Sequence, residues 1–141
     1  MTKAIGLFIG ALLISCVVMS GSAKAQTVSF ADAAALLARD CGADIKKYCK
    51  GLNLGNNAIR NCLEENKANI SPTCTAMAAA VATSIERRLA AQASVMKVCS
   101  GNAKTYCKGV VGEAHILQCL ARTERMDSEK CNQALMDSGW R

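Results

Sequence analysis

The stretch Cys41-Gly-Ala-Asp-Ile-Lys-Lys-Tyr-Cys-Lys-Gly51 decides the architecture, because it returns as Cys99-Ser-Gly-Asn-Ala-Lys-Thr-Tyr-Cys-Lys-Gly109 with six of the eleven positions identical. Each copy leads into the same later landmarks: Gly55, Ile59, Cys62-Leu63, Ser71 and Cys74 in the first, and Gly112, Ile116, Cys119-Leu120, Ser128 and Cys131 in the second. A fixed internal period indicates a repeat architecture. The sequence therefore predicts two tandem units of four cysteines.

The apolar residues around the first block follow helical spacing. Steps of three or four separate Phe30, Ala34, Leu37, Cys41, Ile45 and Tyr48, which places them on one face of a helix. Ser29 with Asp32 predicts the cap at its start, and Lys50-Gly51 predicts its end.

The remaining helices follow from the same signals. A second helix is expected from about Asn57 to Lys67, and a third begins where Ser71 caps and Pro72 takes the first helical position. In the second unit, Glu113 to Arg125 is expected to form a helix with Ile116, Cys119 and Leu120 inward, and Asp127-Ser128 to cap a last helix that Ser138-Gly139 closes. Strand-like alternation is absent, so the predicted class is all-α.

The connection between the units leaves three arrangements open. Cys74 to Cys99 continues at helical spacing, so one helix could reach Cys107, or two helices could be hinged near Ala91 to Ser94 or at Gly101. We expect a signal peptide at 1–25, the first repeat with its leading helix at 26–80, a connecting helix at 81–98 and the second repeat at 99–141.

The cysteine spacing restricts how the thiols can pair. Cys41 and Cys49 are eight residues apart on one predicted helix, about 12 Å, which is too far for a disulfide. A nested and a crossed pairing remain. If the helices on either side of the Leu52–Asn57 turn are antiparallel, the nested set follows: Cys49–Cys62 inside Cys41–Cys74, and Cys107–Cys119 inside Cys99–Cys131.

Metal binding and catalysis are disfavoured by the same residues. Zinc sites generally use close cysteine pairs, and these thiols are spread over longer spacings. His115 is the only histidine, and paired carboxylates or a phosphate-binding glycine loop are not evident. We therefore expect no enzyme, no cofactor, and no catalytic or metal-ligating residue.

The N-terminus predicts export. Lys3 precedes the apolar run from Ala4 to Met19, and Ala23-Lys-Ala25 fits a signal peptidase site before Gln26. The mature protein is then secreted or periplasmic, without a transmembrane span. The alternative is a lipoprotein anchored through Cys16, because Leu13-Ile-Ser-Cys16 fits a lipoprotein box. Eight cysteines in the remainder of a short exported chain indicate a disulfide framework.

Charge gives a weaker indication of partners. The formal charge of +6 falls by two when Lys3 and Lys24 are removed. Basic and acidic residues are interspersed in the first unit, which is typical of a solvated mixed surface. Four lysines recur at matching positions of the two units and could line one binding face: Lys46, Lys50, Lys104 and Lys108. Few aromatic residues and no concentrated basic stripe argue against nucleic acid as a partner.

The pattern C-x-x-D-I-x-x-Y-C-x-G, with a later C-L and then S-x-x-C, resembles the cysteine-rich repeat of the Golgi apparatus protein family, also known as the cysteine-rich fibroblast growth factor receptor. The likeness covers Cys41 to about Met77 and Cys99 to about Met136. It departs in the second unit, where Asn102 and Ala103 replace Asp44 and Ile45.

The resemblance implies a disulfide-bonded helical repeat. Animal members of the family carry many repeats and bind growth factors and selectins, whereas this chain has two repeats behind a signal that looks bacterial. We expect two disulfide-stapled helical hairpin repeats joined by a long or kinked helix, acting as a small protein-binding or cell-envelope interaction module. The alternative is a saposin-like protein that interacts with membranes or lipids.

Overall fold

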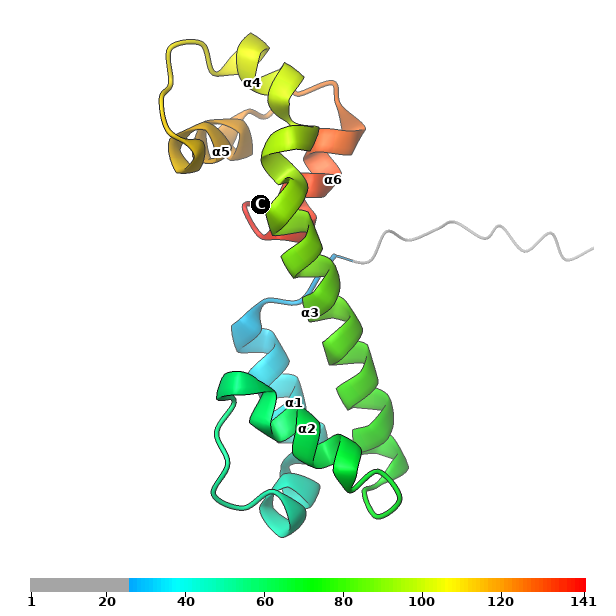
Figure 1. The fold of residues 1–141 in the computed structure, drawn as a ribbon. Coiled ribbons are helices and arrows are strands. Elements are labelled where there is room, and N and C mark those ends of the chain that lie inside the picture. Colours follow the sequence, from blue (N-terminus) through cyan, green and yellow to red (C-terminus); the bar gives the residue numbers. More distant parts are fainter. Residues whose placement is uncertain (1–25) are drawn as a thin grey trace, which may run out of the picture.

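The computed structural model describes residues 26–141, and over this range the chain is helical without strands (Figure 1). The elements are α1 (Phe30–Tyr48), a 3₁₀ turn η1 (Gly55–Asn57), α2 (Ala58–Glu65), α3 (Pro72–Val98), α4 (Ser100–Tyr106), α5 (Glu113–Arg122) and α6 (Glu129–Ser138). The predicted all-α class is confirmed for these residues. The expected signal peptide, its cleavage site and Cys16 lie outside the described residues.

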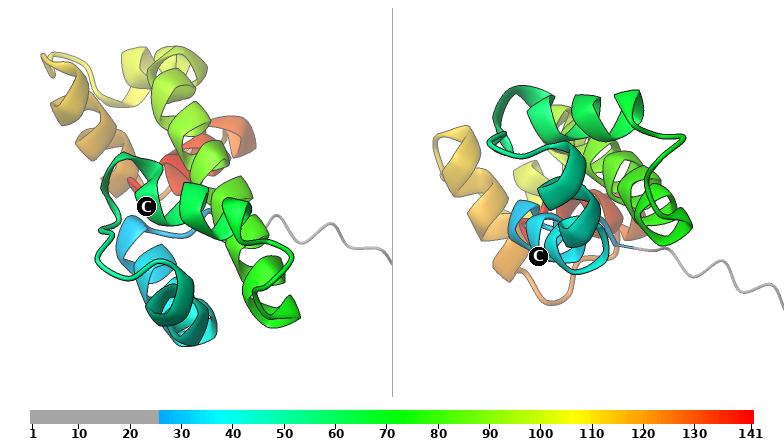
Figure 2. Two further views of the ribbon diagram at one scale, coloured as in Figure 1. Left: turned by 60° about the horizontal axis from the view of Figure 1, so that its bottom comes forward. Right: turned by 90° about the horizontal axis from the view of Figure 1, so that it is seen from below.

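The long helix α3 is the axis of an elongated molecule. α1 and α2 lie beside its first half, and α4, α5 and α6 gather around its second half, as the views in Figures 1 and 2 agree. The two sequence units therefore occupy the two ends, and both use α3. Its first turn contains Cys74, the last cysteine of the first unit, and its end leads into Cys99, the first cysteine of the second. None of the helices between residues 26 and 141 has the length and apolar content to cross a bilayer.

The predicted caps form at three helix starts. The Oγ atoms of Ser29, Ser71 and Ser128 accept hydrogen bonds from the backbone N–H three residues later, at 3.0, 3.2 and 3.2 Å. α2 and α5 end earlier than expected. The Asn66 side chain donates to Cys62 O at 2.8 Å and Thr123 Oγ1 donates to Cys119 O at 3.0 Å, so each side chain satisfies a carbonyl near the end of its helix.

α3 ends at Val98, and the connection between the units breaks at Cys99, two residues before Gly101 and not near Ala91 to Ser94. Cys99 has φ −91° and ψ 4°, while α3 is continuous through Ala91 to Ser94. The following Ser100-Gly101-Asn102 combines residues of modest or poor helix propensity. The disulfide from Cys99 to Cys131 then fixes the chain where the helix is weakest.

Each unit has its own small core. The first consists of Cys41, Cys49, Ile59, Cys62, Leu63 and Cys74, and the second of Val95, Cys99, Cys107, Leu117, Leu120, Met126, Cys131 and Leu135. Disulfides thus supply most of the first core, as small domains often require. Ile116, Cys119 and Leu120 face this core as expected, the first two partly buried, and Leu117, which was not expected to face inward, is also buried.

A set of contacts that we call the Arg88 clasp joins α3, α6 and the segment before α1. Arg88 Nη1 lies 3.4 Å from Thr27 Oγ1 and 3.3 Å from Val28 O, and Thr27 Oγ1 donates to Asp137 O at 2.5 Å. The guanidinium also covers Gly139, where an added Cβ would lie 1.7 Å from Nη2. The leading segment is thereby tied to the second unit as well as to the first.

Candidate functional site

The cysteines form two nested pairs of disulfides. Cα–Cα distances are 4.6 Å for Cys41–Cys74 and 5.9 Å for Cys49–Cys62. The second unit repeats this closely, with 4.9 Å for Cys99–Cys131 and 6.1 Å for Cys107–Cys119. In the first unit the outer bridge joins α1 to the first turn of α3, and the inner bridge joins the end of α1 to α2. In the second unit the outer bridge joins the end of α3 to α6, and the inner bridge joins the end of α4 to α5.

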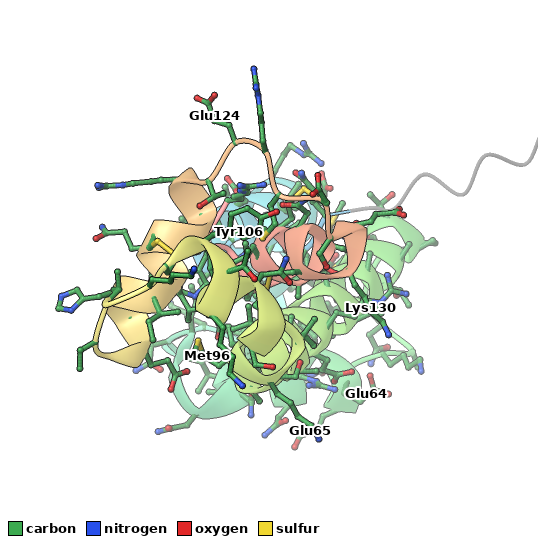
Figure 3. The ribbon with its side chains drawn as sticks, turned by 90° about the horizontal axis from the view of Figure 1, so that it is seen from above. Glu64, Glu65, Met96, Tyr106, Glu124 and Lys130 are labelled. Carbon is green, nitrogen blue, oxygen red and sulfur yellow. A yellow bond between two sulfur atoms is a disulfide. The ribbon has the colours of Figure 1, made fainter. Side chains whose placement is uncertain are left out.

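Asp44, the acidic residue of the repeated motif, has a structural role. Its Oδ2 accepts hydrogen bonds from Ser71 N at 3.2 Å and from Ser71 Oγ at 2.7 Å, which holds the start of α3 against α1. In the second unit Asn102 occupies the matching position, and a different contact holds the start of α6: Tyr106 Oη donates to Asp127 Oδ2 at 3.4 Å. Figure 3 looks down on this end of the molecule and shows Tyr106 lying toward α6.

The four repeated lysines do not come together. Lys46 lies in the last turn of α1 and Lys104 in the last turn of α4, and Figure 1 places these helix ends at opposite ends of the molecule. Lys50 and Lys108 follow them in the adjoining turns, and all four side chains are exposed. They therefore form two separate pairs rather than one continuous face.

The neighbouring Lys47 adds to the basic character of the first pair. Its Nζ lies 4.8 Å from the centroid of the Tyr48 ring. Interaction with the Tyr48 side chain raises the pKa of Lys47 above its usual value.

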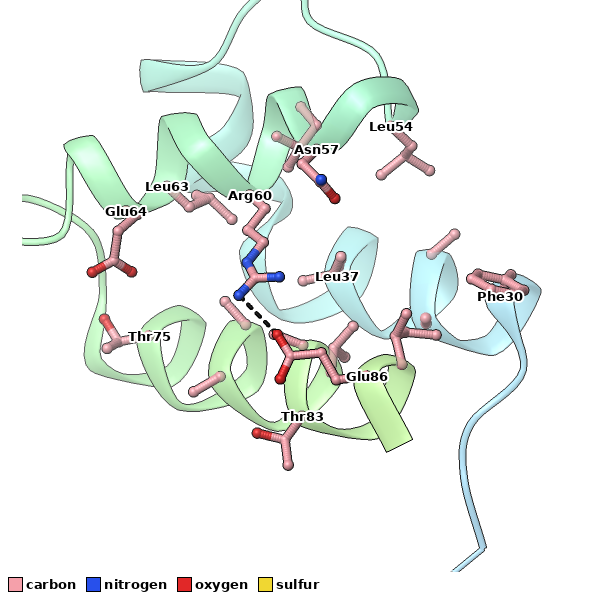
Figure 4. A pocket seen from close by; sticks show the side chains of 18 of the residues that line it. Phe30, Leu37, Leu54, Asn57, Arg60, Leu63, Glu64, Thr75, Thr83 and Glu86 are labelled. Atoms are coloured by element: carbon pink, nitrogen blue, oxygen red, sulfur yellow. Dashed lines mark hydrogen bonds and ion pairs between the residues drawn. The ribbon is translucent and has the colours of Figure 1, made fainter. Parts of the chain in front are cut away.

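A groove lies between α1, α2 and α3 in the first unit (Figure 4). It has a volume of about 690 Å³ and a largely apolar wall, to which α1 contributes Ala33, Ala34 and Leu37, α2 contributes Ile59 and Leu63, and α3 contributes Ala78, Val81, Ala82 and Ile85. Three apolar side chains at its edge, Phe30, Leu54 and Leu89, are each more than half exposed. A volume of this size and lining is typical of binding sites.

Charged side chains of both signs surround the mouth of the groove. Arg60 Nη2 reaches from α2 to Glu86 Oε1 on α3 at 2.9 Å, and Figure 4 shows this ion pair crossing the opening. Lys67 Nζ lies 3.3 Å from Glu64 Oε1. Both pairs are largely exposed to solvent, so each is worth less than about 1 kcal/mol and can be rearranged at little cost.

The groove is specific to the first unit, since the second fills the equivalent space with its own side chains. In the register of the repeats, Leu135 stands for Ala78, Leu117 for Arg60 and Val95 for Leu37. Leu135, Leu117 and Val95 all belong to the buried core of the second unit. Alignment of the two repeats could have revealed that Ala78 stands where the second repeat has Leu135. The apolar periodicity of one repeat does not distinguish an alanine in a groove from an alanine in a core.

Comparison with known proteins relates the chain to one group. No family model matches it, and no solved structure matches it. It is similar to Golgi apparatus protein 1, with 32% identity over 98 residues to the protein of Rattus norvegicus, 31% over 98 residues to that of Homo sapiens and 28% over 97 residues to that of Gallus gallus. Each match covers 67% of this chain and 8% of the relative, so the chain spans a small part of the length of these curated relatives. The four disulfides fit this likeness to a cysteine-rich repeat protein.

Proposed function

We propose that this chain is an exported cysteine-rich repeat module without catalytic activity, which binds a partner protein in the groove between α1, α2 and α3. The likeness to Golgi apparatus protein 1 and the four disulfides support a module of the extracellular type, since disulfides persist in oxidising compartments. Export would follow cleavage between Ala25 and Gln26. A mass of the isolated protein that includes an acylated Cys16 would instead establish a lipoprotein.

The observation that carries the proposal is that the first unit leaves open an apolar space that the second unit fills. Ala78 stands where Leu135 is fully buried, so the hairpin fold itself does not require the groove. An apolar floor with a rim of both charges has the anatomy of a protein interface.

The groove fits an amphipathic helix as its occupant. Its lining residues on α3 extend from Thr75 to Leu89, a rise of about 21 Å, which matches about four helical turns of a partner. The Arg60–Glu86 ion pair lies across this path, but its exposure makes it inexpensive to displace. Displaced, the two side chains become available to opposite charges on the polar edge of the partner helix.

The alternative is a saposin-like protein that opens on lipid. Opening would have to separate α1 from α3, and the Cys41–Cys74 disulfide joins these helices directly. Because this bridge holds α1 and α3 together, it favours a fixed groove that binds a protein rather than a structure that opens onto a bilayer.

Selection of peptides tests the proposal. A displayed library of random 14-residue peptides is panned on the oxidised protein, and binding of the selected peptides is compared with Ala78→Leu, which fills the groove as in the second unit, and Ala82→Glu, which places a charge in it. Selected peptides should be amphipathic helices whose affinity falls at least tenfold for both variants. Failure to enrich such peptides, or equal binding to both variants with unchanged helical content, would refute the groove as the binding site.

A further inference from the structure

The wall that α1 contributes to the groove belongs to one half of that helix. All of its lining residues on α1 precede the Cys41 disulfide along the chain: Phe30, Ala33, Ala34 and Leu37. Figure 4 shows Phe30 at the end of the groove opposite Glu64 and Thr75. The width of the groove at the Phe30 end therefore depends on where the start of α1 lies relative to α3.

The covalent connection between α1 and α3 lies in the other half of α1. Cys41 is joined to Cys74, and three residues further on Asp44 accepts two hydrogen bonds from Ser71. Phe30 precedes Cys41 by eleven residues, a rise of about 16 Å along the helix. A tilt of α1 by about 5° around Cys41 would move Phe30 by about 1.4 Å, enough to lose much of its dispersion contact with a partner. The disulfide alone does not fix this end of the groove.

Noncovalent contacts of the leading segment hold the start of α1. Val28 N donates to Ser84 Oγ on α3 at 2.9 Å, and Arg88 Nη1 donates to Val28 O at 3.3 Å. The next residue, Ser29, caps α1, and Phe30 follows it directly. A displacement of Val28 is therefore passed to the edge of the groove within two residues.

The second unit supplies the other side of the Arg88 clasp through the C-terminal end of α6. Thr27 Oγ1 donates to Asp137 O at 2.5 Å, and the Arg88 guanidinium lies against Gly139, just after α6. No residue of α6 is among those that line the groove. The start of α1 is thus held between α3 and a helix that does not belong to the groove.

The contacts of Arg88 favour a positioning role over that of an ion pair. Its Nη1 donates to two uncharged oxygens, Thr27 Oγ1 and Val28 O, and its Nε is buried without a hydrogen-bond partner within residues 26–141. A buried donor without a partner costs free energy. The effect of Arg88 is therefore to join three segments of the chain rather than to neutralise a charge.

We propose that the Arg88 clasp sets the width of the groove at its Phe30 end, which makes Arg88 a positioning residue for partner binding. The second unit then contributes to affinity through α6 without touching the partner. A protein held in its binding-competent form binds more tightly than one that populates this form only in part. The inference rests on the proposed function, because it concerns the affinity of the same groove.

The affinity of clasp variants for a peptide tests the inference. A helical peptide selected on the original protein is titrated into the oxidised chain from Gln26 and into its variants, with fluorescence anisotropy as the readout. Arg88→Gln should lower the affinity about tenfold, as expected if the clasped position falls to about a tenth of the population. Arg88→Lys should lower it only about threefold, because one bond to Val28 O can remain. Gly139→Ala should also lower it about threefold, because the added methyl group displaces the guanidinium from the side of the second unit.

Hydrogen exchange of the free protein provides a second readout, which needs no peptide. Amides 33–37 of α1 should exchange at least about fivefold faster in Arg88→Gln, whereas those from Cys41 to Tyr48 should be unchanged. Thr27→Val should show the same pattern more weakly. Because Thr27 precedes the first helix, this variant decides the question if circular dichroism shows that Arg88→Gln does not fold.

The control is Arg87→Gln. Arg87 is the exposed neighbour of Arg88 on α3, makes no hydrogen bond or ion pair within residues 26–141, and does not line the groove. This variant should bind the peptide within about twofold of the original protein. Equal losses for Arg87→Gln and Arg88→Gln would overturn the inference, because the loss of a positive charge alone would then explain both.

Two other results would also overturn the inference. One is unchanged peptide affinity in Arg88→Gln, and the other is a lower affinity without faster exchange at the start of α1. If no peptide binds the original protein, the proposed function fails instead. The exchange comparison would still decide whether the Arg88 clasp fixes the start of α1, so the two failures are distinguishable.

Discussion

Removal of the outer disulfide of the first unit should destabilise the protein more than removal of the inner one. Cys41 and Cys74 are 33 residues apart and Cys49 and Cys62 are 13 apart. By loop-closure entropy the two bridges stabilise the fold by about 3.7 and about 2.9 kcal/mol. Burial acts in the same direction: both outer cysteines are wholly inaccessible, so their replacement by alanine also removes core contacts. We expect a total of about 4–5 kcal/mol for the outer bridge and about 3 kcal/mol for the inner one.

Urea unfolding of the oxidised protein, followed by circular dichroism, measures both costs. The variants are Cys41→Ala with Cys74→Ala, and Cys49→Ala with Cys62→Ala as the control of matched chemistry. Cys41→Ala alone should cost within about 0.5 kcal/mol of the outer double variant, because a single loss already breaks the bridge. If the variant without the outer bridge does not fold, it will lack the helical signal in buffer. A folded variant without the inner bridge would then still show that the outer bridge contributes more to stability. An inner bridge that matters more than the outer one would refute the reasoning, because entropy and burial both predict the reverse.

Three further perturbations address particular contacts. Gly139→Ala should destabilise by at least about 1 kcal/mol more than Gly109→Ala in thermal unfolding, since both glycines have φ near +80° but only Gly139 lies under Arg88; equal effects would show that the Arg88 clasp yields freely. Asp44→Ala should cost about 1–2 kcal/mol in urea unfolding and Asp44→Asn less, because asparagine keeps an acceptor for Ser71; a neutral Asp44→Ala would contradict this role. Ala78→Leu should raise stability by about 1 kcal/mol, whereas Leu135→Ala should lower it by about 2–5 kcal/mol, as calorimetry would show; a destabilising Ala78→Leu would mean that the groove is too narrow for the larger side chain.

The sequence predicts the parts of this structure that depend on spacing along the chain. Cys41 and Cys49 are too far apart on one helix to pair, and Ser29, Ser71 and Ser128 mark helix starts, because these features depend only on local geometry. The predicted ends of α2 and α5 were less accurate. The side chains of Asn66 and Thr123 donate hydrogen bonds to backbone carbonyls near these ends, and helix propensity does not predict such bonds.

The groove depends on how deeply side chains fill the space between helices, and the Arg88 clasp depends on contacts between residues far apart in the sequence. The apolar periodicity of a single repeat predicts neither feature. Whether Ala78 faces an open space depends on the size of side chains on three helices together. From the sequence, Arg88 is an ordinary charged residue of a helix, yet it contacts Thr27, 61 residues earlier, and lies against Gly139, 51 residues later. The lysines matched in sequence, but their separation follows from the length of α3, along which the two units are placed.

The shared helix also fixes the rotational phase between the two units. Cys74 and Cys99 are 25 positions apart along the chain, which in an ideal helix is within about 20° of seven whole turns. The outer disulfides therefore leave α3 on nearly the same side, and α1 and α6 attach along one stripe. Insertion of a single residue into α3 would rotate one unit by about 100° against the other and detach Arg88 from its partners. Only additions or deletions of about seven or eleven residues would preserve this alignment, so the length of α3 can change in steps but not gradually.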